Sequence, residues 1–458
     1  MRRGALVLAG LVILMLAVPF GAAAPVVELV KDIRPGVKGS RMSCAVDIAG
    51  TSYFAADDGT HGKELWKSDG TDAGTVLVKE INPGDNDSKP KWLTDVGGTL
   101  YFLTAYDGTH ARELWKSDGT EAGTDIVPGP NWADPVISPP PLLTAVGGTL
   151  YFVRDDELWK SDGTEAGTVL VKGGFGYVGY PSESYGYPSW LTDVGGTLYF
   201  TGDDGTHGWE LWKSDGTEAG TVMVRDIRPG SGESDPFSLT DVGGTLYFEA
   251  NDGTHGYELW KSDGTEAGTV MVRDIWPGVA GSYPYSLIDV GGTLYFAADD
   301  GTHGYELWKS DGTEAGTVMV KDIYTRGVGP SYPDWLTDVG GTLYFRARGG
   351  HHGYELWKSD GTGAGTVLVK DIWAGSDGSL PIYLTDVGGT LYFRADDGTH
   401  GRELWNSDGT EAGTVMVTDL YPGVKDSRPK CFTDAGGVVL FSARTPDTGW
   451  ELWSITPG

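Results

Sequence analysis

The sequence predicts an all-β fold, a single β-propeller of nine four-stranded blades, and three observations support this prediction. First, the tripeptide Glu-Leu-Trp occurs nine times, with its tryptophan at Trp66, Trp115, Trp159, Trp212, Trp260, Trp308, Trp357, Trp405 and Trp453. Successive tryptophans are 49, 44, 53, 48, 48, 49, 48 and 48 residues apart, which is a period typical of repeat architectures. Second, each period contains four short strand-like runs separated by turn residues. Third, the two ends of the chain carry complementary parts of one repeat.

The fifth repeat shows the four expected strands most clearly. Residues 238–242 and 245–250 flank a Gly-Gly turn, and the turn at 252–256 leads to a third strand at 257–261. A longer turn, 262–268, precedes a fourth strand at 269–275. The runs 246–248 and 270–272 are apolar at successive positions, as expected for strands that neighbouring blades cover on both faces. No segment has helical periodicity over a useful length.

The chain ends predict how the ring closes. Residues 26–36 match only the fourth strand of a repeat, whereas the last repeat stops soon after Trp453. We therefore expect the N-terminal strand to complete the last blade, which leaves no exposed sheet edge at the junction. Nine blades exceed the usual range of about four to eight, so fewer blades or two smaller propellers are the alternatives.

The two cysteines support the same closure. Cys44 and Cys431 precede Asp47 and Asp434 by three residues each, at equivalent positions of the first and last repeats. Ring closure would make them neighbours, and an exported protein can keep a disulfide. We expect the two cysteines to be close together, either bonded or as two buried thiols.

The N-terminus predicts export. Residues 1–24 combine Arg2 and Arg3, an apolar run over 5–20 and three alanines at 22–24, as a secretory signal peptide does. Residues 25–458 would then form the propeller, in a secreted, periplasmic or cell-surface protein. An uncleaved anchor is the alternative, and we expect no membrane insertion after signal cleavage. With 34 basic and 64 acidic residues, a net charge of −30 argues against a nucleic-acid partner. We expect a monomer.

The repeat also carries a resemblance. Glu-Leu-Trp followed by Asp-Gly-Thr resembles the bacterial ELWxxDGT repeat proteins, and the motif is complete in eight repeats over about residues 26–458. The ninth repeat ends in Ser-Ile-Thr-Pro-Gly instead. The resemblance implies an exported repeat protein and no particular activity.

The repeated residues are expected to be structural. They are Glu258, Trp260, Asp263, Gly264 and their equivalents. Copies in equivalent environments cannot acquire the different pKa values that acid–base catalysis needs. We expect the carboxylate to accept hydrogen bonds between blades and the tryptophan to pack there.

Cofactors are not expected. All eight histidines lie in turns between second and third strands, and separate blades hold them too far apart to share a metal ion. Acidic pairs such as Asp57-Asp58 and Asp203-Asp204 could hold Ca²⁺, with solvated turns as the alternative. The sequence has no nucleophile elbow, zinc-protease, phosphate-loop or dinucleotide-binding motif.

The loops from each fourth strand to the next first strand differ between repeats and are rich in aromatic residues. The candidate ligand-binding residues on them are Trp132, Tyr177, Tyr180, Tyr185, Tyr187, Trp276 and Trp373. Variable loops on a rigid scaffold commonly carry binding. The sequence thus predicts a non-enzymatic propeller that binds a glycan or protein partner through one face. The alternatives are a cell-surface scaffold whose aromatics pack onto the blade rims, and a polysaccharide-acting enzyme with unlike acids, arginine and tyrosine at the channel mouth.

Overall fold

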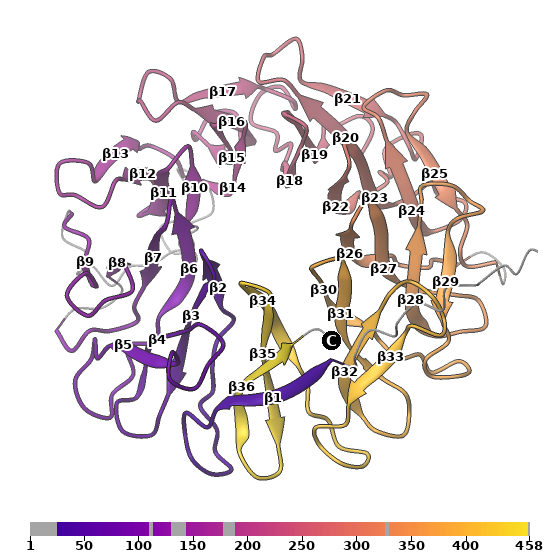
Figure 1. Ribbon diagram of the computed structural model, residues 1–458. Coiled ribbons are helices and arrows are strands. Elements are labelled where there is room, and N and C mark those ends of the chain that lie inside the picture. The colour runs from indigo at the N-terminus through magenta and orange to yellow at the C-terminus, as the bar shows by residue number, and fades with distance from the viewer. Residues whose placement is uncertain (1–24, 110–112, 130–142, 177–187, 326–328, 457–458) are drawn as a thin grey trace, which may run out of the picture.

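Nine four-stranded antiparallel sheets surround a central channel in the computed structural model, which describes residues 25–109, 113–129, 143–176, 188–325 and 329–456 (Figure 1). The first strand of each sheet lies beside the channel and the fourth lies at the rim. The described residues contain no helix. The predicted single propeller of nine blades is therefore confirmed, and neither fewer blades nor two smaller propellers are formed.

We number the blades in chain order. Blade 1 contains β2 (Val46–Ile48), β3 (Thr51–Asp57), β4 (Lys63–Ser68) and β5 (Val76–Lys79). Blade 2 contains β6 (Lys91–Val96), β7 (Thr99–Leu103), β8 (Leu114–Ser117) and β9 (Asp125–Ile126). Blade 3 contains β10 (Thr144–Val146), β11 (Thr149–Arg154), β12 (Glu157–Ser161) and β13 (Val169–Lys172). Blade 4 contains β14 (Ser189–Val194), β15 (Thr197–Asp203), β16 (Trp209–Ser214) and β17 (Val222–Arg225).

The second half of the ring repeats this pattern. Blade 5 contains β18 (Phe237–Val242), β19 (Thr245–Asn251), β20 (Tyr257–Ser262) and β21 (Val270–Arg273). Blade 6 contains β22 (Tyr285–Val290), β23 (Thr293–Asp299), β24 (Tyr305–Ser310) and β25 (Val318–Lys321). Blade 7 contains β26 (Asp334–Val339), β27 (Thr342–Arg348), β28 (Tyr354–Ser359) and β29 (Val367–Lys370). Blade 8 contains β30 (Ile382–Val387), β31 (Thr390–Asp396), β32 (Arg402–Ser407) and β33 (Val415–Thr418). Blade 9 contains β34 (Lys430–Ala435), β35 (Val438–Thr445), β36 (Gly449–Thr456) and β1 (Val26–Lys31).

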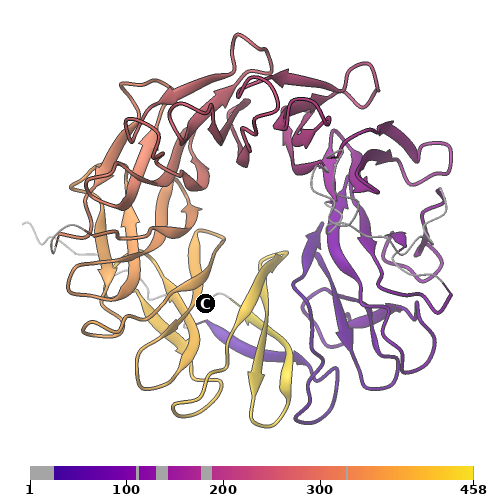
Figure 2. The same ribbon diagram turned by 180° about the vertical axis from the view of Figure 1, so that it is seen from behind.

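Blade 9 combines the two ends of the chain, as predicted. Strand β1 pairs antiparallel with β36, with Leu29 opposite Trp453. Figure 2 shows the indigo first strand lying across the yellow last blade. A disulfide joins Cys44 to Cys431 with a Cα separation of 4.8 Å. The predicted proximity of the two cysteines is confirmed, and they are bonded.

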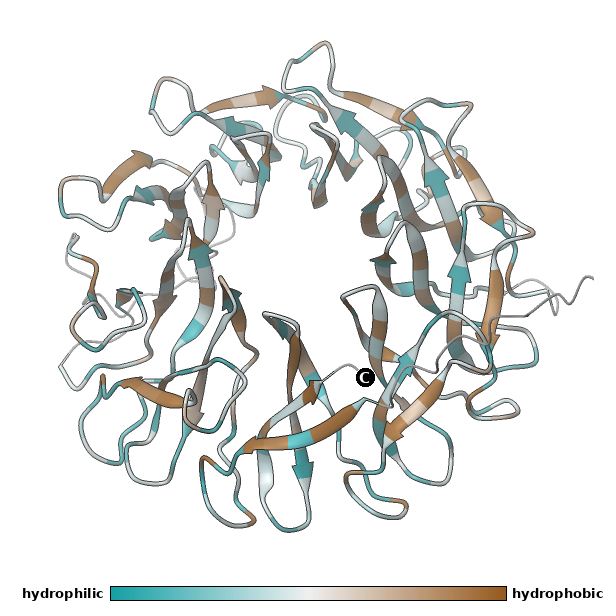
Figure 3. Cartoon of the chain, in the orientation of Figure 1, coloured by the Kyte–Doolittle hydropathy of each residue, from teal (hydrophilic) through white to brown (hydrophobic). Residues whose placement is uncertain are grey.

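The hydrophobic core lies between blades. One cluster combines Tyr199 and Leu211 of blade 4 with Phe248 and Trp260 of blade 5, and equivalent clusters recur around the ring. Figure 3 shows that several rim strands, including β1 and β33, are also mostly apolar, although β1 contains Glu28 and Lys31. The repeated apolar residues therefore fasten each blade to its neighbour.

The Asp-Gly-Thr turn is fixed by its own side chains. Asp263 Oδ1 accepts hydrogen bonds from the Thr265 amide at 2.8 Å and from its hydroxyl at 2.7 Å. Gly264 has a φ of 84°, and a Cβ there would overlap the Tyr199 hydroxyl of the preceding blade. Only glycine meets both conditions without strain.

The repeated glutamate is buried and ties each blade to the following loop. The Glu258 carboxylate accepts hydrogen bonds from the amides of Ile275, Trp276 and Ser282 at 2.9, 3.2 and 2.9 Å, and from the Ser282 hydroxyl at 2.6 Å. Burial raises the pKa of Glu258 to about 7. Because the Ile275 amide is used in this way, β21 ends at Arg273, two residues before the predicted end of this strand.

Blade 3 departs from this arrangement. Asp155 and Asp156, both with positive φ, form a short turn in place of the histidine-bearing turn. Glu157 is only partly buried and accepts a hydrogen bond from the Trp159 indole at 3.2 Å.

Candidate functional site at the channel mouth

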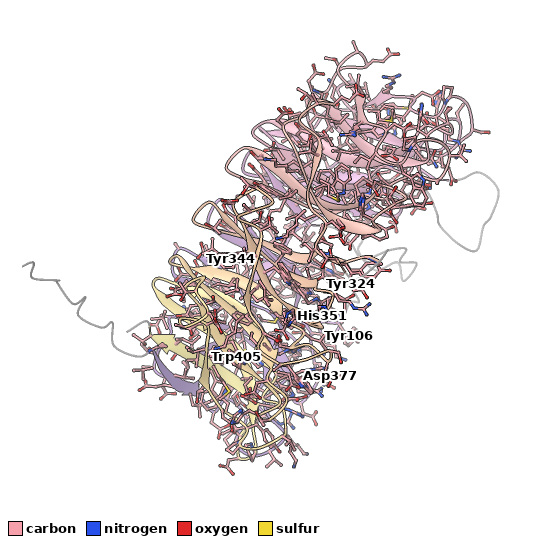
Figure 4. The ribbon with its side chains drawn as sticks, turned by 90° about the vertical axis from the view of Figure 1, so that its right-hand side faces the viewer. Tyr106, Tyr324, Tyr344, His351, Asp377 and Trp405 are labelled. Atoms are coloured by element: carbon pink, nitrogen blue, oxygen red, sulfur yellow. A yellow bond between two sulfur atoms is a disulfide. The ribbon has the colours of Figure 1, made fainter. Side chains whose placement is uncertain are left out.

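The loops between blades and the turns between second and third strands lie on one face of the ring. Seen edge-on, Tyr106, Tyr324, His351 and Asp377 lie along one side and Tyr344 lies on the other (Figure 4). Tyr324 and Asp377 belong to loops between blades, whereas Tyr106 and His351 belong to turns within blades. We call the channel opening on this face the mouth.

Two of the predicted ligand-binding aromatics pack against this face. Trp276 and Trp373 directly follow the repeated isoleucine after β21 and β29, and both are half-buried. Each indole covers a turn glycine of the next blade, so that a Cβ at Gly301 or Gly398 would lie 2.6 or 2.7 Å from it. The other five predicted residues, Trp132, Tyr177, Tyr180, Tyr185 and Tyr187, lie outside the described residues.

A strained position recurs at the mouth in seven blades. It follows a buried serine, usually precedes a proline, and has a φ between 44° and 52° in Arg41, Lys89, Asp235, Tyr283, Tyr332, Leu380 and Arg428. A bulky residue in this left-handed region costs on the order of 1–3 kcal/mol. In six of the seven, its amide donates a hydrogen bond to the residue before Glu-Leu-Trp in the preceding blade, as Tyr283 does to the Tyr257 carbonyl at 3.0 Å. The backbone is therefore constant while the side chain changes from blade to blade.

A second residue with left-handed backbone conformation lies three residues after the strained position. It forms a β-bulge in the first strand of the blade, beside the channel. Depending on the blade, this residue is Trp92, Trp190, Ser238, Ser286, Trp335, Tyr383 or Cys431. The three tryptophans are 42%, 44% and 38% exposed, whereas Trp260 of the repeat is 5% exposed. Trp190 contacts Phe237 and Trp335 contacts Tyr383, with ring centroids 6.1 and 5.1 Å apart. Trp92 also lines a hollow of about 270 Å³ with Cys44 and Val46. The innermost strands thus carry exposed aromatic rings.

Blades 5 to 7 contribute a row of tyrosines, which we call the tyrosine arc: Tyr257, Tyr283, Tyr285, Tyr305, Tyr332 and Tyr354. Tyr257 stacks on Tyr283 at 5.3 Å between ring centroids, and Tyr305 stacks on Tyr332 at 5.6 Å. Tyr285 meets Tyr305 edge-on at 5.4 Å. Stacking holds these rings in place before any ligand arrives.

Unlike charged groups converge on the tyrosine arc. The Tyr257 hydroxyl donates a hydrogen bond to Asp235 at 2.9 Å, and Arg346 pairs with Asp334 on the neighbouring strand. Glu249 lies near Asp235, and burial together with the Asp235 charge raises the pKa of Glu249 to about 8. Acids, arginine and tyrosine therefore meet at the mouth, which is the arrangement that the enzyme alternative requires.

Five histidine turns are paired internally, each through the aspartate three residues before the histidine, whereas His352 pairs with Asp371 outside its turn. His255 Nδ1 lies 2.7 Å from Asp252, whose other carboxylate oxygen accepts the amide protons of Thr254 and His255. This hydrogen bond raises the pKa of His255. Within the described ranges, no three His, Cys, Asp or Glu side chains are grouped so that they could hold a metal ion. His110 lies outside those ranges.

Comparison with known proteins identifies no family for this chain. No family model and no curated protein match the sequence. Among solved structures, a puromycin hydrolase S511A mutant is 14% identical with a TM-score of 0.39, and the match covers 78% of this chain and 59% of that one. A puromycin-hydrolyzing peptidase of Mycobacterium tuberculosis is 11% identical with a TM-score of 0.43, over 93% of this chain and 61% of that one. This chain thus spans about three fifths of their length, and no statement on activity follows from such distant likenesses.

In the described part of the chain, no helix has the length and apolar character needed to cross a membrane.

Sequence reasoning missed the exposed tryptophans of the first strands and the acids Asp235 and Glu249. A signal was present, because aligned repeats are nearly identical except in the interblade loops and the few residues after the buried serine. The few residues after the buried serine place their side chains at the mouth. Their position there depends on the bulge in the first strand, which the sequence does not show.

Proposed function

We propose that this chain is an exported, non-enzymatic propeller that binds a glycan at the mouth. The observation that carries the proposal is the exposure of Trp92, Trp190 and Trp335 on the innermost strands. Aromatic rings with one free face offer a flat apolar surface beside polar groups, which suits the faces and hydroxyls of sugar rings.

The scaffold supports this assignment. The three tryptophans stand on a backbone that the neighbouring blades hold in a strained conformation, so binding would not have to order them. The predicted loop residues Trp132, Tyr177, Tyr180, Tyr185 and Tyr187 remain candidates for contact with the same ligand. A glycan is favoured over a protein partner because the described exposed tryptophans stand singly on first strands of separate blades, whereas protein partners bury broad surfaces.

The proposal includes the expectations drawn from the repeat itself. The chain would belong with the ELWxxDGT repeat proteins and act as a monomer, in a secreted, periplasmic or cell-surface location. Binding through aromatic and polar side chains would require no cofactor, and Ca²⁺ would be dispensable.

The test is a glycan-binding screen on the purified chain without its first 24 residues, with and without chelator. Trp190→Ala and Trp335→Ala should each weaken binding of the selected glycan about tenfold or more, since stacking on an aromatic ring contributes roughly 1–3 kcal/mol. Tyr106→Ala is the matched control, because Tyr106 is exposed on the same face within the turn of another blade. Binding that survives both tryptophan substitutions would refute this site, and capture of proteins alone would favour a protein partner.

A polysaccharide-acting enzyme is the second candidate, favoured by Asp235, Glu249 and Tyr257. Glycoside hydrolysis uses two carboxyl groups in different protonation states. A pKa of about 8 keeps Glu249 protonated at neutral pH, as a general acid requires. The Asp235 carboxylate, held by the Tyr257 hydroxyl, would act as the second group.

Hydrolysis assays distinguish the two candidates. An enzyme would release reducing sugar from the glycan selected in the binding screen, and Glu249→Gln would abolish that release. Glu266→Gln is the control, because Glu266 lies in an exposed turn between third and fourth strands, away from the tyrosine arc. Binding without release would leave the non-enzymatic proposal standing.

A further inference from the structure

Blades 8, 9, 1 and 2 carry basic side chains at another part of the mouth, although the chain as a whole has a net charge of −30. We call the following residues the basic arc: Lys63, Lys91, Arg394, Arg402 and Lys430. Lys63, Lys91, Arg402 and Lys430 each begin a strand, and Arg394 lies in β31. Ring closure brings them together from both ends of the sequence.

The five cations are close enough to repel one another. Burial lowers the pKa of Lys63, and the charges of Arg41, Lys430 and Lys91 lower it further. Burial and the charge of Arg394 lower the pKa of Lys430. Burial likewise lowers the pKa of Arg394, to which the charge of Arg402 contributes. The cations of the basic arc are therefore neighbours of one another, with the carboxylates of Asp87 and Asp426 beside them.

Arg346 and Arg394 give an internal comparison. They occupy equivalent positions in neighbouring blades, where Arg346 faces Asp334 and Arg394 faces Ile382 on the paired strand. Arg346 forms an ion pair with Asp334. In contrast, the buried Nε of Arg394 has no hydrogen-bond partner among the described residues. Its guanidinium carbon lies 4.9 Å from the centre of the Tyr383 ring.

The nearby acids are engaged with other groups. Asp87 accepts the Lys63 amide at 2.9 Å and pairs with Lys89 at 3.4 Å. Asp426 accepts the Arg402 amide at 3.1 Å and pairs with Arg428 at 2.7 Å. Across the described ranges, no side chain of the basic arc forms an ion pair with a carboxylate. Four of the five cations, all except the exposed Lys91, are partly buried. Partly buried cations without counter-charges are costly, and a bound anion would remove that cost.

Aromatic rings accompany these cations. The Lys430 ammonium lies 4.7 Å from the centre of a Trp450 ring, and the Lys91 ammonium lies 5.7 Å from a Trp92 ring. A ligand on this half of the mouth would therefore meet flat apolar surfaces and positive charge together. The tyrosine arc, in contrast, presents the acids Asp235 and Glu249.

We propose that the basic arc binds the carboxylate or sulfate groups of an acidic polysaccharide whose acidic residues alternate with neutral ones. This inference rests on the proposed glycan-binding function and deepens it. When acidic and neutral sugar units alternate along the polysaccharide, the acidic units can face the basic arc while the neutral units face the tyrosine arc. A nucleic acid carries a phosphate at every residue, so it fits the two-sided mouth less well.

The experiment measures binding of four probes to the purified chain by calorimetry: hyaluronan with carboxylates, keratan sulfate with sulfates, neutral dextran, and single-stranded oligothymidine. We expect hyaluronan or keratan sulfate to bind more tightly than dextran or oligothymidine, with affinity falling as salt is added. Tighter binding of hyaluronan would identify carboxylate as the recognised group, and tighter binding of keratan sulfate would identify sulfate. Tighter binding of oligothymidine, or equal binding of dextran, would overturn the inference.

The variants locate the site. Arg394→Gln with Lys430→Gln should weaken binding of the acidic polysaccharide about tenfold or more, because each removes a charge-assisted hydrogen bond. Lys91→Gln is a second variant at an exposed position, where folding should be unaffected. Lys38→Gln, which removes one charge as Lys91→Gln does but in an exposed loop of the same face, should alter affinity by less than about twofold. Equal effects of Lys38→Gln and the arc variants would refute the inference. If only neutral glycans bind, the inference fails and the proposed function stands; if no glycan binds, both fail.

Discussion

Leu29 pairs with Trp453 across blade 9, so the first described strand of the chain lies in the same sheet as the last. The Cys44–Cys431 disulfide spans the adjoining contact between blades 9 and 1. The basic arc takes Lys63 from one side of this junction and Lys430 from the other. Closure of the ring is thus a condition for the proposed binding site as well as for the fold.

Replacing both cysteines should loosen this junction. The disulfide closes a sequence separation of 387 residues, and the chain-entropy model assigns a loop of that size a stabilisation of roughly 6 kcal/mol. We expect Cys44→Ser with Cys431→Ser to lower the melting temperature and to speed amide exchange in β1 and β36 before the other blades. The native fold itself would be retained, because β1 still pairs with β36. Uniform exchange across all blades would contradict this expectation.

Reduction of the disulfide should also weaken binding at the basic arc more than at the tyrosine arc. The basic arc requires blades 8, 9, 1 and 2 to keep their relative positions, whereas the tyrosine arc lies within blades 5 to 7. Calorimetric titration of the acidic polysaccharide with and without reductant measures the effect. Trp190 lies far from the junction in sequence, and its contribution to glycan binding should not change on reduction. Equal affinity in both redox states would show that the β1–β36 pairing alone fixes the arc.

The repeated glutamate allows a matched comparison between blades. Glu258→Ala leaves four donors without their acceptor, three of them in buried hydrogen bonds, so it should cost about 3 kcal/mol or more. Glu157→Ala removes one partly exposed hydrogen bond to Trp159 and should cost less than about 1 kcal/mol. Denaturant unfolding of the two variants tests the difference, and equal losses would show that the hydrogen-bond network contributes little.

The fold could be read from the sequence because its determinants are local and repeated. Glu-Leu-Trp, Asp-Gly-Thr and the Gly-Gly turn each fix a strand or a turn within one blade, and the unmatched segments at the two ends specify closure. The proximity of Cys44 and Cys431 also followed from their equivalent repeat positions, whereas the sequence left open whether they are bonded. Because each motif recurs in most repeats, the same local pattern predicts the same strand or turn many times over.

Stability should increase on mild acidification. Burial raises the pKa of Glu64, Glu210 and Glu258 to about 7, from about 4.3 in an unfolded chain. The folded state then binds the proton more tightly, so this stabilisation is present below pH 4 and is lost as pH rises through 7. The turn histidines act in the same direction, because a hydrogen bond to Asp252 raises the pKa of His255.

Thermal unfolding followed between pH 8 and pH 5 tests this expectation. The melting temperature should rise as pH falls, until carboxyls with lowered pKa, such as Asp263, begin to protonate in more acidic solution. Glu258→Gln should reduce the pH dependence, because the amide cannot titrate. A melting temperature that falls steadily from pH 8 to pH 5 would contradict the expected sign.

The site was harder to read because its determinants are not local. The exposure of Trp92 and Trp190 depends on a left-handed residue and a bulge in each first strand. Glu249 and Asp235 meet only through the packing of the interblade loop against β19. The predicted loop aromatics Trp276 and Trp373 instead cover turn glycines. A list of aromatic residues cannot separate those that pack from those that face the channel.

The strained position after the buried serine provides the last prediction. Leu380 has a φ of 50° and an exposed side chain, so its backbone is strained while its side chain contributes little packing. Leu380→Gly should be more stable than Leu380→Ala by about 1 kcal/mol, because glycine adopts this conformation freely whereas alanine keeps the strain. The comparison between the two variants cancels the loss of the leucine side chain. Denaturant midpoints measure this difference in stability, and a glycine variant less stable than the alanine variant would show that the backbone is unstrained at the mouth.

Tyr283→Gly should also relieve backbone strain. It removes a ring that stacks on Tyr257, however, and so should reduce ligand binding.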